Sequence, residues 1–493
     1  MSGPVAPTRH IAPSDLEVGS TGEPPVRMPR VLVLTLVLGA FLGMVDATVV
    51  AVALDPLGRH FGVSLAASQE VLAVYLVTVT AALPTLGRLG DRFGRRGSYG
   101  AGFAVFGLGS VVAAVAPSFA VLLVGRAAQA VGGGLLTAGS LALIAQHAPR
   151  GRTGRSVALL VVTQAVAGLL GPPLGGLLVA GFGWQAVFWA GVPFALAGVA
   201  LASTVLPPSG RGARVGIDAP GAIALGVLLL GLGAGVSALG GPLPGGITAA
   251  EALGVAGVAL LALLLVEPRA RHPLVDRALF GSGRFAAASL ATFLSTGTLM
   301  STFALLPFWL EDAHAASPTL AGIAFLPIGI GIGATSRRGG RRGDAGSTGR
   351  VTTTGMLVAA AGMGLAAVSA LTRLWPLLAV GLLVLGCGNG LFSAPNTAAA
   401  MRSAPRAALG SASGFLSTAR NAGVIVGLGI TGAVYTVLSR HADAGGADRA
   451  AALLFAAAGV LCLVVGMIAA RTYRGADTMR VTPERPAEAA ASA

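Results

Sequence analysis

The chain has 493 residues, of which 54% are hydrophobic and 11% charged, with a formal net charge of +14. A soluble protein could not hide so much apolar surface from water, so the composition indicates a polytopic membrane protein. All 33 basic residues are arginines, and most of them lie between apolar runs, a pattern that orients membrane proteins and argues against nucleic-acid binding. Cys387 and Cys462 lie inside apolar runs, which argues against a disulfide framework and against a metal site.

Apolar runs of membrane length predict an all-α protein with 14 transmembrane helices. Residues 1–30 are rich in Pro, Gly and polar residues and are predicted to be a disordered cytoplasmic tail. The separation of the seventh helix from the eighth depends on a Gly/Pro-rich turn at Gly240–Gly246. The predicted helices are 31–54, 69–87, 97–116, 119–146, 155–180, 184–206, 220–239, 249–267, 285–310, 319–336, 351–370, 374–400, 411–438 and 450–470.

The arginines test this helix count, because positive residues gather on the cytoplasmic side of a membrane. With a cytoplasmic N-terminus, most of them fall in cytoplasmic segments. Those expected outside are Arg59, Arg373, Arg440 and Arg449, and Arg126 and Arg420 lie within helices. We therefore expect a multi-pass protein of the plasma (cytoplasmic) membrane with both termini in the cytoplasm.

A charged segment, G-R-L-G-D-R-F-G-R-R, joins the second and third predicted helices. Its glycines allow close backbone approach and turns with positive φ, and its aspartate can cap a helix end or pair with arginine. The segment resembles the signature loop of the major facilitator superfamily of transporters, which implies a conformational-switch role. The alternative is an ordinary cytoplasmic loop that follows the positive-inside rule. The residues concerned are Gly87, Arg88, Gly90, Asp91, Arg92, Gly94, Arg95 and Arg96.

A weak internal repeat supports two related halves, since Gly340–Asp344 repeats the G-R-x-G-D pattern of Gly87–Asp91. The resemblance implies the major facilitator fold, with two six-helix bundles and two inserted helices. The predicted order is an N-terminal bundle at 31–206, a cytoplasmic linker at 207–219, inserted helices at 220–268, a C-terminal bundle at 269–470 and a cytoplasmic tail at 471–493.

The first helix carries Asp46 among apolar residues, and an ionisable group at membrane depth is a candidate functional site. The surrounding residues resemble the L-D-x-T-V-V-x-V-A-L-P motif of the fourteen-helix drug:proton antiporters, the multidrug resistance exporters. The sequence departs from that motif by inserting Asp55 before Pro56. The resemblance implies that Asp46 couples transport to protons. The alternative is a buried aspartate that only links helices by hydrogen bonds.

Arg126 in the fourth helix is the expected partner of Asp46. Arg126–Gly132 resembles the family's R-x-x-Q-G motif, with Ala130 in place of the usual glycine. At ~1.5 Å per residue, Asp46 and Arg126 both lie about 12 Å below the outer surface. Because the superfamily places these two helices beside a central cavity, the pair would keep Asp46 ionised until substrate or a movement separates it. The alternative is a purely structural ion pair.

The fifth helix contains a run of small and helix-breaking residues that permits close helix packing and a kink. The run resembles the G-P-x-x-G-G signature of superfamily exporters, which implies export and disfavours import. An ordinary glycine packing seam would explain the glycines but not the adjoining proline. The residues are Gly168, Gly171, Pro172, Gly175 and Gly176.

The sequence contains no P-loop or nucleophile elbow, so an ion gradient is the expected energy source, with no enzyme activity and no cofactor. We expect a monomeric antiporter that exports small lipophilic or cationic drugs and antibiotics in exchange for protons by alternating access within the lipid bilayer. Polar residues at lipid depth are candidates to line its cavity. These candidates are Tyr75, Thr78, Gln164, Ser295, Thr298 and Asn389, although Asn389 is equally explained by helix linking.

Two alternatives remain open. A narrow-specificity exporter of one metabolite, such as an antibiotic made by the same cell, would share all these features, because polyspecific cavities have few fixed polar groups. A non-transporting membrane sensor or scaffold is disfavoured, since no appended soluble domain is recognisable in the sequence.

Overall fold

The structure is a computed structural model that describes residues 29–63, 68–149, 152–206, 219–238, 247–266, 277–281, 283–314, 320, 323–405, 408–439 and 445–474. The linker predicted at 207–219 and the tails predicted at 1–30 and 471–493 lie outside the described residues, apart from a few residues at their helix junctions.

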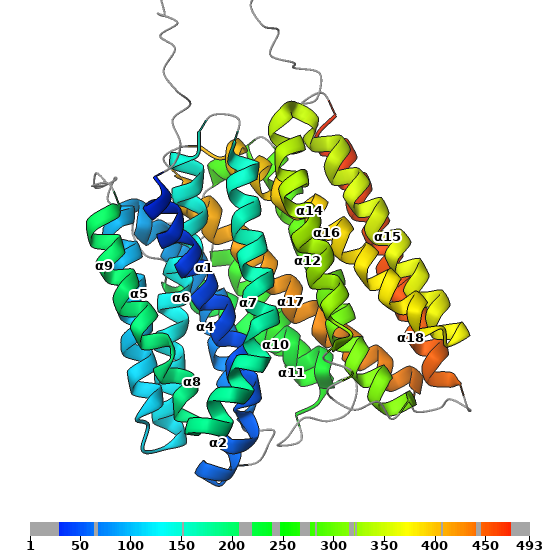
Figure 1. The fold of residues 1–493 in the computed structure, drawn as a ribbon, viewed down its shortest axis with the longest axis horizontal. Coiled ribbons are helices and arrows are strands. Elements are labelled where there is room, and N and C mark those ends of the chain that lie inside the picture. Colours follow the sequence, from blue (N-terminus) through cyan, green and yellow to red (C-terminus); the bar gives the residue numbers. More distant parts are fainter. Residues whose placement is uncertain are drawn as a thin grey trace, which may run out of the picture.

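Two helical bundles lie side by side (Figure 1). The N-terminal bundle contains α1 (Arg30–Val52), α2 (Leu54–Phe61), α4 (Glu70–Phe93), α5 (Arg95–Ala114), α6 (Phe119–His147), α7 (Thr153–Phe182), α8 (Gln185–Trp189) and α9 (Gly191–Val205). The C-terminal bundle contains α12 (Arg284–His314), α14 (Leu326–Arg342), α15 (Thr348–Thr372), α16 (Trp375–Ser403), α17 (Leu409–Ser439) and α18 (Gly446–Thr472), with a short 3₁₀ turn at Arg277–Phe280. Between the bundles come α10 (Ala219–Ala238) and α11 (Ala249–Val266).

Each predicted helical range contains a helix in the structure. By length and hydropathy, however, nine helices in the described part could cross a membrane, or ten if the bent α7 is one span. That count treats Leu326–Thr372 as one stretch, although the chain turns at Gly343–Ser347, where Gly346 has a φ of 84°. It also leaves α10 and α11 as shorter apolar helices. The chain is a multi-pass membrane protein, and the number of 14 spans stays a prediction.

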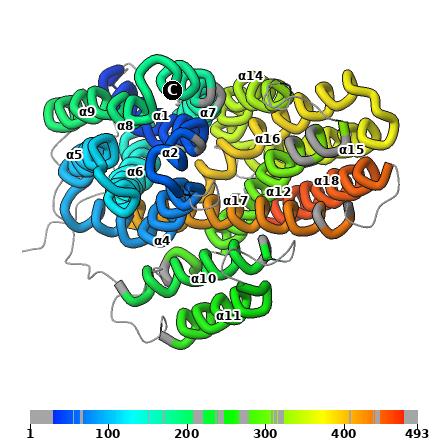
Figure 2. The backbone as a smooth tube through the Cα atoms, turned by 90° about the horizontal axis from the view of Figure 1, so that it is seen from below, coloured from blue at the N-terminus to red at the C-terminus, as the bar shows by residue number. Residues whose placement is uncertain are grey.

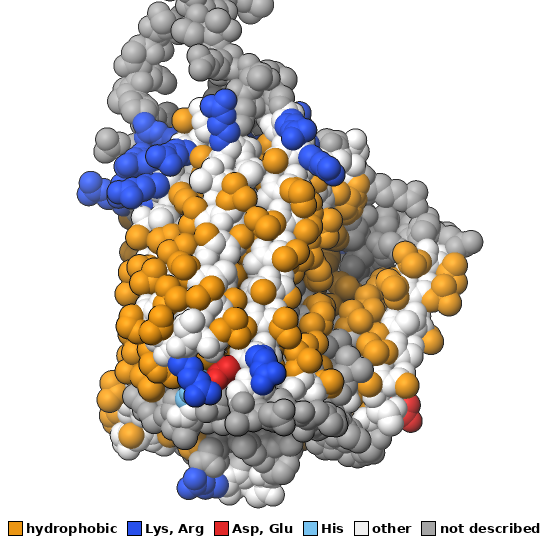
Figure 3. Space-filling view, turned by 90° about the vertical axis from the view of Figure 1, so that its right-hand side faces the viewer, with side chains coloured by type: hydrophobic (Ala, Val, Ile, Leu, Met, Phe, Trp, Pro, Cys, Tyr) orange, Lys and Arg blue, Asp and Glu red, His pale blue; other side chains and the backbone are white. Residues whose placement is uncertain are grey.

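The surface follows this arrangement. Apolar side chains cover the middle of the molecule, and arginines gather at one end (Figure 3). We call this end, where α1 begins and α4 ends, the arginine-rich end. The apolar middle matches the hydrocarbon core of a bilayer, where charged side chains are expensive.

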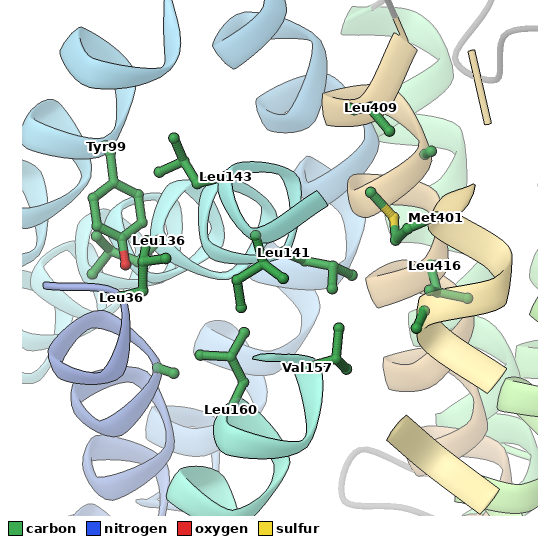
Figure 4. Packing of buried hydrophobic residues seen from close by; sticks show 14 of the residues in the cluster. Leu36, Tyr99, Leu136, Leu141, Leu143, Val157, Leu160, Met401, Leu409 and Leu416 are labelled. Carbon is green, nitrogen blue, oxygen red and sulfur yellow. The ribbon is translucent and has the colours of Figure 1, made fainter. Parts of the chain in front are cut away.

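Buried apolar residues join the two bundles near the arginine-rich end. One cluster combines Leu36, Tyr99 and Leu141 of the N-terminal bundle with Met401 and Leu416 of the C-terminal bundle (Figure 4). Two further clusters each stay within one bundle, one around Leu57, Leu122 and Phe188, the other around Trp309, Met363 and Phe455. Because burial of apolar surface favours association, the halves are held together mainly near the arginine-rich end.

The inserted hairpin of α10 and α11 lies beside the two bundles (Figure 2). Helix α10 contacts α4 of the N-terminal bundle and α17 of the C-terminal bundle. Glycines permit both contacts, since a Cβ at Gly226 would lie 3.2 Å from Ala81, and one at Gly233 would lie 3.0 Å from Ile425. The hairpin therefore spans the line where the two bundles meet.

Candidate functional site

Asp46 and Arg126 form a buried ion pair between α1 and α6. Arg126 Nη1 lies 2.7 Å from Asp46 Oδ2. The arginine is fully buried and the aspartate is 8% exposed. The structure thus brings together the two residues that were matched by depth in the sequence. A charged pair in such surroundings needs further hydrogen bonds to offset the loss of hydration.

Gln129 supplies several of those hydrogen bonds. It accepts one from Arg126 Nη1 at 2.8 Å and donates to Asp46 Oδ1 at 3.2 Å and to Ser110 Oγ at 2.7 Å. Arg126 Nε donates to the carbonyl oxygen of Val71 at 3.1 Å. The carboxylate is therefore held by two donors on α6, and α4 and α5 fix the geometry of those donors. The R-x-x-Q-G motif contained Arg126 and Gln129, but nothing in the sequence indicated the hydrogen bond from Arg126 to Val71 or the one from Gln129 to Ser110.

Aromatic rings enclose the ion pair. The Arg126 guanidinium lies 4.6 Å from the centroid of the Tyr75 ring and 5.9 Å from that of Phe188. Ring faces attract cations and shield them from water, which strengthens nearby electrostatic interactions. Tyr75, predicted as cavity lining, is 8% exposed and instead packs against the charged pair.

Helix α7 packs closely against the segment of α1 that contains Asp46. A Cβ at Gly171 would overlap the Thr48 side chain, and one at Gly175 would lie 2.9 Å from the Val49 carbonyl oxygen. A Cβ at Gly168 would lie 3.1 Å from Met44, whereas one at Gly176 would meet nothing within 4 Å. Between its segments Thr153–Gly168 and Pro173–Phe182, which flank Gly171 and Pro172, α7 bends by 44°. The G-P-x-x-G-G motif on α7 therefore shapes the surroundings of Asp46.

The charged segment at Gly87–Arg96 is mostly helical, so the prediction of a loop between the second and third helices was wrong. Helix α4 continues to Phe93, and within the segment only Gly94 has a positive φ, of 89°. A Cβ at Gly87 would overlap the backbone of Gly410 on α17, whereas one at Gly90 would meet nothing within 4 Å. Gly87 therefore permits contact between the halves. Helix α5 begins directly after Gly94, so the turn between the two helices is confined to this glycine.

Asp91 connects α4 to the first turn of α17. Its two carboxylate oxygens accept hydrogen bonds from the backbone amides of Gly410 and Ser411, both at 3.1 Å. Arg95 Nη2 donates to Asp91 Oδ1 at 3.0 Å, and Arg95 Nη1 donates to the Ala142 carbonyl oxygen at 2.8 Å. A carboxylate at a helix N-terminus satisfies free amides and interacts favourably with the helix dipole. We call this set the Asp91 contact.

A second contact repeats the first with the halves exchanged. Asp344, directly after α14, accepts hydrogen bonds from the backbone amides of Gly154 at 2.7 Å and Arg155 at 2.9 Å, in the first turn of α7. Arg402 Nη1 lies 3.6 Å from Asp344 Oδ1. We call this set the Asp344 contact. The sequence repeat pointed to Asp344. The one signal in the sequence for the amides that Asp344 and Asp91 bind was a glycine at the second position of both α7 and α17.

The other predicted cavity residues lie on four helices, α4, α7, α12 and α16. Thr78 on α4 and Gln164 on α7 are half-buried. The hydroxyl groups of Ser295 and Thr298 donate to carbonyls of their own helix, at 3.2 Å and 2.9 Å. Asn389 is 8% exposed and accepts a hydrogen bond from Ser393, one turn further along α16. That these residues line one cavity stays a prediction.

The family model of the Major Facilitator Superfamily matches residues 36–343 and again residues 288–492. The chain belongs to this superfamily. It is therefore a membrane transporter of small molecules, and its double match agrees with two related halves. Transporters of this superfamily are in general not enzymes.

Curated relatives and solved structures agree with this assignment. The chain is 30% identical over 414 residues to a multidrug resistance protein B homolog of Mycobacterium tuberculosis, covering 83% of the chain and 76% of the relative. It is 26% identical over 400 residues to the riboflavin transporter RibZ of Clostridioides difficile, covering 80% of the chain and 86% of the relative. The crystal structure of the human organic anion transporter MFSD10 has the same fold, with a TM-score of 0.63, 19% identity and coverage of 89% and 99%.

Proposed function

We propose that this transporter exports lipophilic compounds in exchange for protons by alternating access. The observation that supports it best is the Asp46–Arg126 pair, in which a carboxylate at membrane depth is 8% exposed. A nearby arginine favours the charged form of a buried carboxylate, so the carboxylate takes up a proton when that arginine moves away. Movement that separates α1 from α6 at this pair would therefore couple proton uptake to a change in conformation, and re-formation of the pair would couple proton release to the reverse change.

The contacts between the halves support alternating access. The Asp91 and Asp344 contacts both lie at the arginine-rich end, where the shared apolar cluster also lies. Under the positive-inside rule this end faces the cytoplasm. The structure then corresponds to a state closed toward the cytoplasm, and export requires that both contacts break and re-form in each cycle.

A narrow-specificity exporter is the second candidate. One relative bears the name of a transporter for a single vitamin, riboflavin, while the other bears the name of a multidrug resistance protein. Either specificity is compatible with the same proton site. Susceptibility of a cell without its own exporters, measured with and without this protein across many compounds, separates broad from narrow export.

Efflux from proteoliposomes under an imposed pH gradient tests proton coupling. Asp46→Asn keeps the size of the side chain but cannot release a proton, so gradient-driven efflux should be lost while equilibration without a gradient remains. Glu251→Gln is the matched control, because Glu251 is an exposed acid at the start of α11, far from the pair. Full gradient-driven efflux by Asp46→Asn would remove Asp46 from the mechanism.

A further inference from the structure

Arg420 is a cation at membrane depth whose charge is not neutralised by the groups around it. It lies 11 residues after the start of α17 at Leu409, or about 16 Å along the helix axis at 1.5 Å per residue. Its side chain is half-buried. Among the residues that the structure describes, no carboxylate and no hydrogen-bond acceptor pairs with its guanidinium.

The direction of Arg420 follows from its neighbours on α17. Ser413, two helical turns earlier and so on the same face, donates a hydrogen bond to the Ala138 carbonyl oxygen of α6 at 2.6 Å. Gly414 and Thr418 lie on another face and contact Leu83 and Thr80 of α4. Arg420 therefore points toward the space between the bundles, two turns deeper in the membrane than the Ser413–Ala138 hydrogen bond.

Ser289 on α12 lies at the level of Arg420. Phe285 packs against Phe415, and about two and three turns further along α12 Phe293 and Gly297 pack against Gly423, so Ser289 falls beside residues 419–420. Thr292 faces α16, since Asn396 donates to its hydroxyl at 3.0 Å, and Phe293 faces α17. Ser289, one turn before both, points between these two helices.

The Ser289 hydroxyl is also free. The side chain is 4% exposed, and within the described part of the chain its oxygen has no hydrogen-bond partner. A buried hydroxyl without a partner costs free energy, and a ligand that forms a hydrogen bond with it would remove this cost. Arg420 and Ser289 thus offer a cation and a hydroxyl at the same depth.

The charges at the centre of the protein leave Arg420 uncompensated. Asp46 is neutralised by Arg126. The other carboxylates with described pairs lie toward the ends of the molecule, where Asp91 pairs with Arg95, Asp344 with Arg402, and Asp448 with Arg373 and His314. An unpaired cation inside a membrane protein is expensive, and an anion that binds there removes this cost.

We propose that Arg420 and Ser289 bind the anionic group of the transported compound. The proposal rests on the proposed export function and narrows its substrate class to lipophilic organic anions, opposite in charge to the cations expected from the family resemblance. A guanidinium holds a carboxylate or sulfonate through two parallel hydrogen bonds, and the Ser289 hydroxyl donates a third. The apolar remainder of the compound would lie between the bundles.

Two dyes with the same ring system and opposite charge test this proposal, fluorescein as the anion and tetramethylrhodamine methyl ester as the cation. Their dissociation constants are measured by fluorescence anisotropy with the purified full-length protein. The wild type should bind fluorescein at least about 10-fold more tightly. Arg420→Gln should weaken fluorescein binding about 10- to 100-fold and leave the ester unchanged, because a charge-assisted bidentate contact is lost. Arg420→Lys should restore part of the affinity.

Arg449→Gln is the matched control, since Arg449 is an exposed arginine in the first turn of α18 and its replacement should not affect the binding of either dye. Binding needs no proton gradient, so Asp46→Asn should still bind fluorescein. Charge-selective binding without gradient-driven efflux would contradict the proposed export function alone. An unchanged fluorescein affinity in a monodisperse Arg420→Gln protein, or a wild type that does not prefer fluorescein, would overturn the role of Arg420.

Discussion

The Asp91 contact should stabilise the state that is closed at the arginine-rich end, and Asp91→Asn tests this directly. The Asp91 carboxylate accepts one backbone hydrogen bond from Gly410 and one from Ser411. An asparagine has one oxygen and one NH₂ group in the same place. It can keep one of the two hydrogen bonds, without the charge, and it turns a donor toward the other amide.

The expected magnitude follows from these two bonds. A hydrogen bond to a charged group contributes about 1.5–3 kcal/mol, and a neutral one about 1 kcal/mol. The charge also loses its interaction with the α17 dipole, worth roughly 0.3–1 kcal/mol. Loss of one bond, weakening of the other and loss of the dipole interaction should therefore cost the closed state at least about 2 kcal/mol, which changes the ratio of closed to open molecules by roughly 30-fold or more.

Distance measurements between spin labels provide the assay. Phe93 at the end of α4 and Ala345 after α14 are exposed, one in each half, and accept labels as cysteines in a background without Cys387 and Cys462. Asp91→Asn should shift the distances toward longer values and impair transport, while membrane abundance stays nearly normal. Arg338→Gln, an exposed charge change at the same end, is the control.

Two results would refute this reasoning. Unchanged distances and transport in Asp91→Asn would show that the two hydrogen bonds do not favour the closed state. A parallel loss of protein and activity would show instead that the segment guides insertion or folding.

Three further predictions concern packing, stability and topology. Gly171→Ala should lower the thermal unfolding temperature in detergent, because overpacking against Thr48 costs about 1–3 kcal/mol. Gly176→Ala is the control and should leave this temperature unchanged, since a Cβ there has open space. Equal effects of the two variants would contradict the close contact. Asp448→Asn should lower the free energy of unfolding in denaturant by about 2–4 kcal/mol. The substitution weakens the contacts of the carboxylate with Trp309 at 2.9 Å, His314 at 3.0 Å and Arg373 at 2.8 Å. Unchanged stability would show that these contacts contribute little. Reporter fusions at Arg30 and Arg471 should be cytoplasmic and one at Gly241 external, and an odd number of spans from such mapping would contradict the predicted topology.

Much of the fold could be predicted from the sequence, because a bilayer imposes strong local constraints. Backbone groups in hydrocarbon must be paired within a helix, so each long apolar run contains a helix. Most arginines lie at one end because moving them through the bilayer is costly. The same constraint made the depths of Asp46 and Arg126 calculable from helix rise alone, and the structure brings the two residues within 2.7 Å.

The tertiary structure alone decided which groups these residues meet across the chain. Asp91 binds amides 319 and 320 residues away, and Asp344 binds amides 190 and 189 residues away. Backbone amides are the same in every sequence, so no local pattern marks them as partners. Likewise, the charge of Arg420 is visible in the sequence, but its lack of a counter-charge depends on how α17 is rotated against α6 and α12. That rotation is set by the packing of Ser413, Gly423 and Gly427 against other helices, which a one-dimensional pattern does not contain.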